Sequence, residues 1–502
     1  MTTADKIAER NRLFQGHSEE LCKLQREFNS VSLRKKKRLE HVNKRRANAC
    51  VDSFFTISLE FPAFIIPNEV KGKYPELAEE KLSSLQRLRV LVSLLRNSQN
   101  IPDTELIACM NRLIARTKDF PFEQIFDDRM IQVLLSGLLS TNEVLIIDIL
   151  CCLINIFNES NEQINNSFIS RNFITISTDF LQYSQNENII ENTLWALSNL
   201  MGENKLATKI VYDQKLWKHI LRFCSGSSYT LRSTAQWVLS NLARDKHFNE
   251  EESMEIILIA KLGLLSDNEE TMKNSAWTLF YLTDSDSLVE FIFQARIELT
   301  LLPLTKYHSS QVQYPILKVF GNISTSSNEN VFIYLIEQNF INLISTLLTH
   351  PELKIKAEVL FIFSNFLAAS GQVVLFITSL PCFKVLVKFL DSDKFKIKKE
   401  AICAVCNAAC CKDWEVIKVF ITQNIFSKLI ESLYYNSSEV LVWILDAVLH
   451  SLQTAQGSID LDCLQDFYRD FTQMEGFSRL NQLIHSPNLE ISDKSFKILN
   501  FL

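Results

Sequence analysis

The 502-residue chain has few residues that interrupt helices, with ten Gly and ten Pro, about a third of average usage for its length. Leu, Ile, Phe and Lys are abundant, and this combination predicts an almost wholly helical protein. Hydrophobic residues make up 47% of the chain, enough for a large buried core.

No apolar run is long and continuous enough for a membrane helix. Residues 144–157 are too few and include Asp148, and residues 359–380 are interrupted by Asn365, Gly371 and Gln372. Met1 opens a polar, charged segment, so no signal peptide is expected. The sequence therefore predicts neither membrane insertion nor secretion.

Chemistry-bearing motifs are also missing. Eight His lack a Ser/Asp or Cys partner pattern, and no glycine loop could hold a phosphate. Six of the twelve Cys lie in apolar helical runs, where thiols behave as small hydrophobes, and Cys406 and Cys410 have no His at zinc-finger spacing. We expect no enzyme, no cofactor, no metal site and a reducing intracellular environment.

Charge is divided unevenly along the chain. Residues 1–50 carry a net charge of +7, densest in SLRKKKRLEHVNKRRANA, and the remaining 452 residues carry −13. The first segment has only scattered apolar residues and is predicted to be largely disordered alone. An acidic body is a poor general nucleic-acid binder, so no direct nucleic-acid partner is expected.

A tryptophan or its equivalent, followed four residues later by Asn or Tyr, recurs every 40 to 44 residues. The seven copies are Cys151/Asn155, Trp195/Asn199, Trp237/Asn241, Trp277/Tyr281, Lys318/Asn322, Phe361/Asn365 and Cys403/Asn407. Helical repeats of this period are typical of armadillo or HEAT solenoids. We predict an all-α, armadillo-repeat, right-handed superhelical solenoid preceded by a basic arm. Its predicted parts are an arm (1–50), a junction (51–76) with a loop around Pro67 to Pro75, and about ten repeats (77–502).

Within a repeat, the pair is expected on the last helix. SMEIILIAKLGLL is amphipathic, SDNEE is a turn with capping residues, and TMKNSAWTLFYL is the next predicted helix. A four-residue step places both members of each pair on one helix face, so stacked repeats align them in a strip.

The strip suits an extended, lysine-rich peptide. Parallel indoles would form slots for a Lys or Arg stem, and Asn would meet both the N–H and the C=O groups of a peptide backbone. Glu203, Asp284 and Asp286 would face the cationic tips. The alternative is that these are only core residues, but Asn at six of seven positions is a poor helix former, and its recurrence favours a surface role.

Two motifs resemble the importin alpha (karyopherin alpha) family. WALSNL, WVLSNL, WTLFYLTD and PILKVFGN match its consecutive repeats in order. The arm matches the core of the family's importin-beta-binding domain at Leu33, Arg34, Lys35, Lys37, Arg38, Glu40, Lys44, Arg45 and Arg46. The resemblance spans roughly residues 10 to 500.

The resemblance implies a nuclear import adapter that shuttles between cytoplasm and nucleus. It would bind nuclear localisation signals in the strip and importin beta through the arm, and an export receptor would recycle it. Lys44, Arg45 and Arg46 would fold back into the strip without importin beta. The implied major site is Asn155, Trp195, Asn199, Glu203, Trp237, Asn241, Trp277 and Tyr281. The implied minor site is Lys318, Asn322, Glu358, Phe361, Asn365, Glu400 and Asn407.

Three replacements depart from the family pattern. Cys151 stands where the first major-site tryptophan is expected, and Phe361 and Cys403 replace both minor-site tryptophans. We therefore expect a degraded minor site. The family's first arginine cluster in the arm is reduced to Lys23 and Arg26, and its acidic tail is absent after Leu502. The open alternative is a divergent armadillo scaffold that binds another extended partner without an import function.

Overall fold

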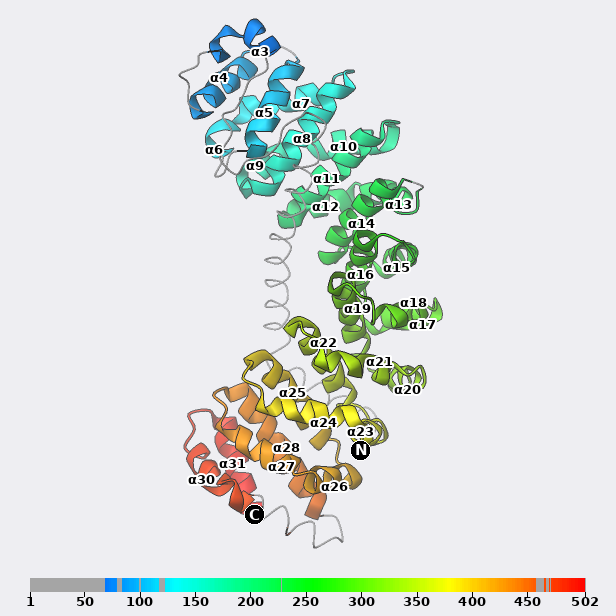
Figure 1. Ribbon diagram of the computed structural model, residues 1–502, viewed down its shortest axis with the longest axis vertical. Coiled ribbons are helices and arrows are strands. Elements are labelled where there is room, and N and C mark those ends of the chain that lie inside the picture. The colour runs from blue at the N-terminus through cyan, green and yellow to red at the C-terminus, as the bar shows by residue number, and fades with distance from the viewer. Residues whose placement is uncertain are drawn as a thin grey trace. The chain divides into compact units, whose positions relative to one another are not determined.

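The computed structural model describes residues 68–78, 84–98, 101–116, 122–226, 228–456, 465, 469 and 471–501 (Figure 1). Within these ranges the chain is helical and contains no strand. The predicted all-α fold is confirmed.

The chain divides between Leu282 and Thr283 into two compact units. We call the described residues 68–282 the N-terminal unit and the described residues 283–501 the C-terminal unit.

The N-terminal unit contains helices of 4 to 17 residues and one 3-10 turn, η1 (Pro75–Leu77). Its helices are α3 (Asn68–Lys73), α4 (Ser84–Arg96), α5 (Thr104–Arg116), α6 (Phe122–Ile125), α7 (Asp128–Leu138), α8 (Glu143–Glu159), α9 (Glu162–Ser170), α10 (Phe173–Tyr183), α11 (Glu187–Glu203), α12 (Lys205–Asp213), α13 (Leu216–Cys224), α14 (Tyr229–Arg244), α15 (Glu250–Leu264) and α16 (Glu269–Leu282).

The C-terminal unit is built in the same way, with 3-10 turns η2 (Thr346–Thr349), η3 (Phe389–Asp391) and η4 (Ser432–Tyr434). Its described helices are α17 (Asp286–Gln294), α18 (Glu298–Leu304), α19 (Ser310–Ile323), α20 (Glu329–Glu337), α21 (Phe340–Ser345), α22 (Leu353–Phe366), α23 (Gly371–Ser379), α24 (Pro381–Lys388), α25 (Phe395–Ala409), α26 (Trp414–Thr422), α27 (Ile425–Glu431), α28 (Ser438–Gln456), α30 (Gly476–Leu483) and α31 (Leu489–Phe501).

Most repeats consist of two short helices followed by a longer third helix, as in α9, α10 and α11. The third helices pack side by side in each unit, as α5, α8, α11, α14 and α16 and as α19, α22, α25, α28 and α31 (Figure 1). Large apolar side chains such as Trp217, Phe168 and Phe363 are fully buried between the helices. This is the armadillo architecture that the repeat period predicts.

The turns before the second helices of the repeats are built without glycine at the left-handed position. Six of these turns place a residue other than glycine in the left-handed region, with φ between 51° and 67°: Asn172, Lys215, Arg296, Asn339, Asn424 and Glu475. L-residues are disfavoured there because Cβ crowds the backbone, and Asn tolerates it best. No described glycine has positive φ. The chain therefore accepts local backbone strain where glycine would be free of it.

The predicted junction is not wholly a loop. Helix α3 lies within it, with Val70 buried, and its last residue, Lys73, forms an ion pair with Asp103, which also accepts a hydrogen bond from the Tyr74 hydroxyl at 3.1 Å. These contacts attach the segment to the start of α5.

Among the described residues, no single helix has both the length and the apolar character needed to cross a bilayer. Two strongly bent pairs, Glu329–Glu337 with Phe340–Thr349 and Gly371–Ser379 with Pro381–Asp391, meet the length and composition criteria only when taken together.

Candidate functional site

The repeated pairs lie on the third helices, as predicted, and we call those of α8, α11, α14 and α16 the N-terminal ladder. The aromatic side chains of Trp237, Trp277 and Tyr281 are half-buried, and Trp195 is 6% exposed. On α16 the rings of Trp277 and Tyr281 stack at 5.9 Å with 22° between their planes. The four-residue spacing therefore does place both rings on one helix face.

The asparagines of the N-terminal ladder are buried and join neighbouring third helices. Asn199 Nδ2 donates to the Ile154 carbonyl at 2.8 Å. Asn241 Nδ2 donates to the Ser198 carbonyl at 3.0 Å and to Ser198 Oγ at 2.8 Å. The recurrence of Asn thus has a structural cause that the sequence analysis missed, because the amide ties each repeat to the one before it.

The ladder also begins one repeat earlier than the sequence pattern suggested. Asn155 Nδ2 donates to Asn111 Oδ1 on α5 at 3.0 Å and to the carbonyl of Cys151 at 3.0 Å. Asn111 precedes Asn155 by one repeat length, so continuing the register backwards would have found it.

These bonds limit what the amides can offer a ligand. Both N–H groups of the Asn241 amide can be accounted for by Ser198, so its oxygen is the group left for a peptide N–H. Asn199 Oδ1 is buried and has no hydrogen-bond partner among the described residues. That Asn241 also serves a peptide backbone stays a prediction.

The indoles of Trp195 and Trp237 are not parallel. Their centroids are 6.4 Å apart, and their planes meet at 69°, edge to face. A methylene stem between two parallel rings needs planes about 7 Å apart, since each carbon–carbon contact takes about 3.5 Å or slightly more. The predicted parallel arrangement is therefore wrong for this pair of indoles.

The acidic groups differ from those expected. The side chain of Glu203, the last residue of α11, lies outside the described residues. Asp286 accepts hydrogen bonds from the backbone N–H and the hydroxyl of Ser327 in the next repeat. Asp148 on α8, three residues before Cys151, was not among the acidic residues predicted to face a peptide. Burial raises the pKa of its carboxyl to about 6, and the nearby Arg112 guanidinium opposes that rise.

In the C-terminal unit, we call the pairs on α19, α22 and α25 the C-terminal ladder. Their asparagines also donate hydrogen bonds to the preceding repeat. Asn365 Nδ2 donates to Ser324 Oγ at 2.8 Å, and Asn407 Nδ2 donates to the Ser364 carbonyl at 2.9 Å. Asn322 donates to Thr283 Oγ1 at 3.4 Å, the longest of these bonds. Phe361, Cys403 and Glu400 are half-buried.

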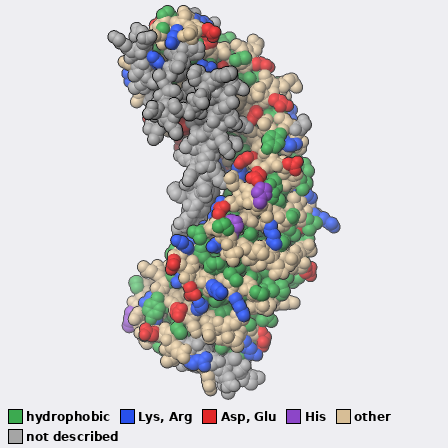
Figure 2. All heavy atoms as spheres, viewed as in Figure 1, with side chains coloured by type: hydrophobic (Ala, Val, Ile, Leu, Met, Phe, Trp, Pro, Cys, Tyr) green, Lys and Arg blue, Asp and Glu red, His purple; other side chains and the backbone are tan. Residues whose placement is uncertain are grey.

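Two acidic residues on third helices of the C-terminal unit are paired with lysines of the preceding third helix. Lys318 Nζ lies 2.6 Å from Glu358 Oε2, and both side chains are nearly buried, at 11% and 7% exposed. Lys399 Nζ lies 2.7 Å from Glu439 Oε2. Figure 2 shows other Lys and Arg side chains among Asp and Glu on the visible face of this unit. Lys318 therefore acts as an internal counter-ion for Glu358.

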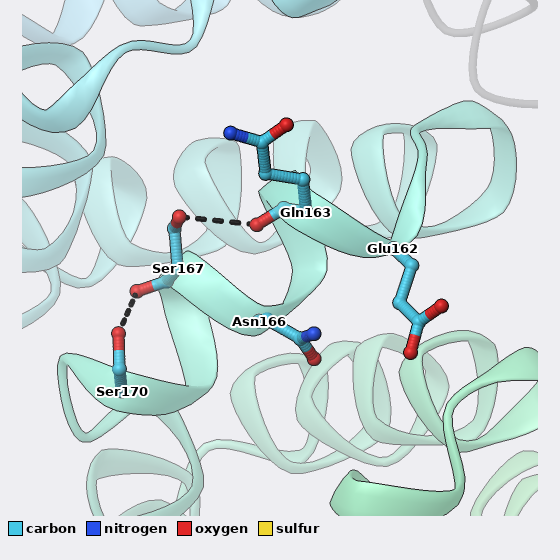
Figure 3. Close-up of a pocket in the computed structure, with 5 residues that line it drawn as sticks. All are labelled: Glu162, Gln163, Asn166, Ser167 and Ser170. Carbon is cyan, nitrogen blue, oxygen red and sulfur yellow. Dashed lines mark hydrogen bonds between the residues drawn. The ribbon is translucent and has the colours of Figure 1, made fainter.

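Other surfaces of the described chain give weaker evidence for a binding site. A cavity of about 520 Å³ is lined by Glu162, Gln163, Asn166, Ser167 and Ser170, all from α9 (Figure 3). Two of its hydroxyls, Ser167 and Ser170, donate to carbonyls of the same helix. Within the described ranges, no three His, Cys, Asp or Glu side chains are grouped so as to hold a metal ion. The arm residues Arg34, Lys35, Lys37, Arg38, Lys44, Arg45 and Arg46 lie outside the described residues.

No protein-family model matches the chain, but curated relatives do. Importin subunit alpha-8 of Arabidopsis thaliana is 25% identical over 320 residues, covering 63% of this chain and 72% of the relative. Importin subunit alpha-3 of the same plant is 24% identical over 493 residues, covering 94% and 88%.

A likeness to a solved structure supports the fold alone. The crystal structure of an engineered protein has a TM-score of 0.71 and 19% identity, covering 84% of this chain and 99% of that one. Together with the ladder of third helices and the curated relatives, these findings identify the chain as an importin-alpha-like armadillo-repeat protein.

Proposed function

We propose that the chain is a nuclear import adapter whose N-terminal ladder binds lysine-rich localisation signals. The observation that supports this most directly is the placement of Trp195, Trp237 and Trp277 on three successive third helices that pack side by side. The names of the relatives, importin alpha subunits, point to the same transport role.

Binding would combine the aromatic faces with the buried amides. The faces of Trp237 and of the Trp277–Tyr281 stack are half-exposed and attract a Lys or Arg stem and its charge. Asn199 Oδ1, which lacks a partner within the described chain, would accept a peptide N–H. Entry of a stem beside Trp195 requires one indole to rotate, so we expect binding by induced fit at that step.

The test is Trp237→Ala in the full chain, measured with a fluorescent peptide that carries one lysine cluster. Loss of a central aromatic anchor costs about 2 kcal/mol or more, so affinity should fall at least tenfold. Trp414→Ala is the matched control, because Trp414 is also half-buried but lies on α26, outside the ladder. Equal affinities for Trp237→Ala and the unmodified chain would refute the assignment.

For the C-terminal ladder we propose only weak binding of a second basic cluster. Glu358 is paired with Lys318, Phe361 keeps one aromatic face, and Cys403 has none. A peptide with two basic clusters should therefore bind less than tenfold more tightly than its longer cluster alone. A larger gain, above about 1.4 kcal/mol, would show that these substitutions are tolerated.

We also propose that the arm binds importin beta, that Lys44, Arg45 and Arg46 compete with cargo, and that an export receptor recycles the chain between nucleus and cytoplasm. The rival function is an armadillo scaffold that binds another extended partner. Residues 1–50 fused to a carrier should retain purified importin beta on a column. If they do not, while the lysine-rich peptide still binds the full chain, the scaffold function is favoured.

A further inference from the structure

Trp443 lies one repeat beyond the pairs found in the sequence, three residues before the ladder position of its helix. It follows Cys403 by 40 residues, one repeat length, and lies half-buried on α28, which packs beside α25. The ladder position of α28 itself holds Asp446, so the Trp/Asn pattern does not detect Trp443. The two preceding ladder positions, Phe361 and Cys403, lack an indole.

The Trp443 ring already holds a lysine ammonium. Lys399 Nζ, from α25, lies 5.3 Å from the ring centroid and 2.7 Å from Oε2 of Glu439. Glu439 precedes Trp443 by one helical turn, so the carboxylate and the ring share one face of α28. An aromatic wall with a carboxylate one turn away is the combination that suits an ammonium or guanidinium group.

Lys399, Glu400 and Cys403 of α25 and Glu439 and Trp443 of α28, which together we call the α25–α28 slot, gather charge around a small side chain. Burial raises the pKa of the Cys403 thiol to about 12, with the Glu400 and Glu439 carboxylates adding to the rise and Lys399 opposing it. The charged ends of Lys399, Glu400 and Glu439 therefore act on one point of the ladder, where the side chain of Cys403 fills little volume.

We infer that the α25–α28 slot is a binding site for one Lys or Arg side chain of an extended basic peptide, and that Lys399 occupies it as a built-in competitor. The inference rests on the proposed function, since it assumes that third helices bind such a peptide. The side chains of Lys399 and Glu439 are 25% and 34% exposed, and an ion pair that water reaches is weak. A peptide side chain can therefore displace Lys399.

The experiment uses the full chain labelled with 5-fluorotryptophan, which gives six ¹⁹F resonances because the chain has six Trp. Trp443→Phe and Trp237→Phe each assign one of them. An acetylated and amidated eight-residue lysine-rich peptide is titrated into the unmodified chain, Lys399→Met, and Lys399→Met/Glu439→Gln. Lys428→Met is the matched control, because Lys428 also pairs with an acid of this unit, Asp391, but lies on α27 away from any ladder ring.

In Lys399→Met, we expect the Trp443 resonance to reach half-saturation at a peptide concentration at least fivefold lower than in the unmodified chain. Lys428→Met should match the unmodified chain, and Glu439→Gln should remove the gain. The inference is overturned if Trp443 does not respond in Lys399→Met while Trp237 does, or if Lys428→Met gives an equal gain from charge alone. If no ladder resonance responds, the proposed function itself fails.

Discussion

Asn241→Ala should loosen the contact between α11 and α14 while leaving the ladder tryptophans in place. The amide of Asn241 is 3% exposed and makes two hydrogen bonds to Ser198, at 3.0 and 2.8 Å. Alanine removes both donors. The Ser198 carbonyl keeps a helical partner on its own helix, so the loss is close to the net value of the two bonds.

The expected magnitude is about 2 kcal/mol, since one buried hydrogen bond contributes about 1 kcal/mol net. In a repeat array this acts on one interface between neighbours rather than on the whole chain. A single unfolding free energy is poorly defined for such a chain, so the effect must be measured locally. A loss of about 2 kcal/mol corresponds to roughly thirtyfold faster amide exchange through local opening.

Hydrogen–deuterium exchange of peptides from α11 and α14 is the assay. The matched control is Asn188→Ala, because Asn188 lies on α11 but is exposed and should change stability by less than about 0.5 kcal/mol. The stabilising role of the Asn241–Ser198 hydrogen bonds is refuted if exchange in α11 and α14 stays unchanged in Asn241→Ala. A fall in peptide affinity without faster exchange would instead make Asn241 a ligand contact only.

Three further predictions concern other parts of the chain. Burial raises the pKa of Asp148 to about 6, so its contribution to stability is present below its unfolded pKa near 4 and is lost as pH rises through 6. Asp148→Asn should therefore raise the thermal midpoint at pH 7.5 but not at pH 4, and equal shifts at both pH values would exclude this cause. Changing Lys44, Arg45 and Arg46 to Ala should tighten binding of the one-cluster peptide at low salt, since a tethered competitor can act at millimolar effective concentration. Identical affinities with and without the triple change would leave the arm no competing role. Lys215→Gly should stabilise the α12–α13 turn by up to about 1 kcal/mol, because φ is 54° there and the side chain is exposed. Asn172→Gly, where Asn already tolerates this conformation, should gain less in the same thermal scan.

The repeat period was enough to predict the fold because it fixes which helices become neighbours. The spacing from Trp195 to Trp237 and Trp277 places one pair on each of α11, α14 and α16, and the structure confirms that placement. The helix–turn–helix expected in the repeat that contains Trp277 is also confirmed, as α15 and α16.

Side-chain roles were harder to predict because they depend on the rotation of adjacent helices about their axes. The sequence showed that Asn is a poor helix former but not that Asn241 reaches back to Ser198. It showed two indoles on successive helices but not their 69° angle. Such quantities follow from interhelical packing, which a single sequence does not encode in any local pattern.

Some features that the sequence analysis missed could nevertheless have been predicted from the repeat period. Lys318 and Glu358 are 40 residues apart, as are Lys399 and Glu439. Searching for opposite charges 40 residues apart would have paired these side chains. Trp443 was missed because it lies three residues before the ladder position of α28, which holds Asp446.

The strip that the proposal assigns to cargo is also the strip that holds the repeats together. A ladder side chain has two kinds of partner, the residue one repeat away and the side chain of a bound peptide. In the C-terminal unit, Lys318 and Lys399 supply the first kind, so a peptide must compete for Glu358 and Glu439. In the N-terminal unit the repeat-to-repeat contacts fall on Asn amides, and the aromatic faces of Trp237 and Trp277 stay half-exposed. Peptide affinity should therefore fall when aromatic residues of the N-terminal ladder are removed. It should rise when the lysines that pair with Glu358 and Glu439 are removed. We expect removal of Trp237 to weaken binding and removal of Lys399 to strengthen it.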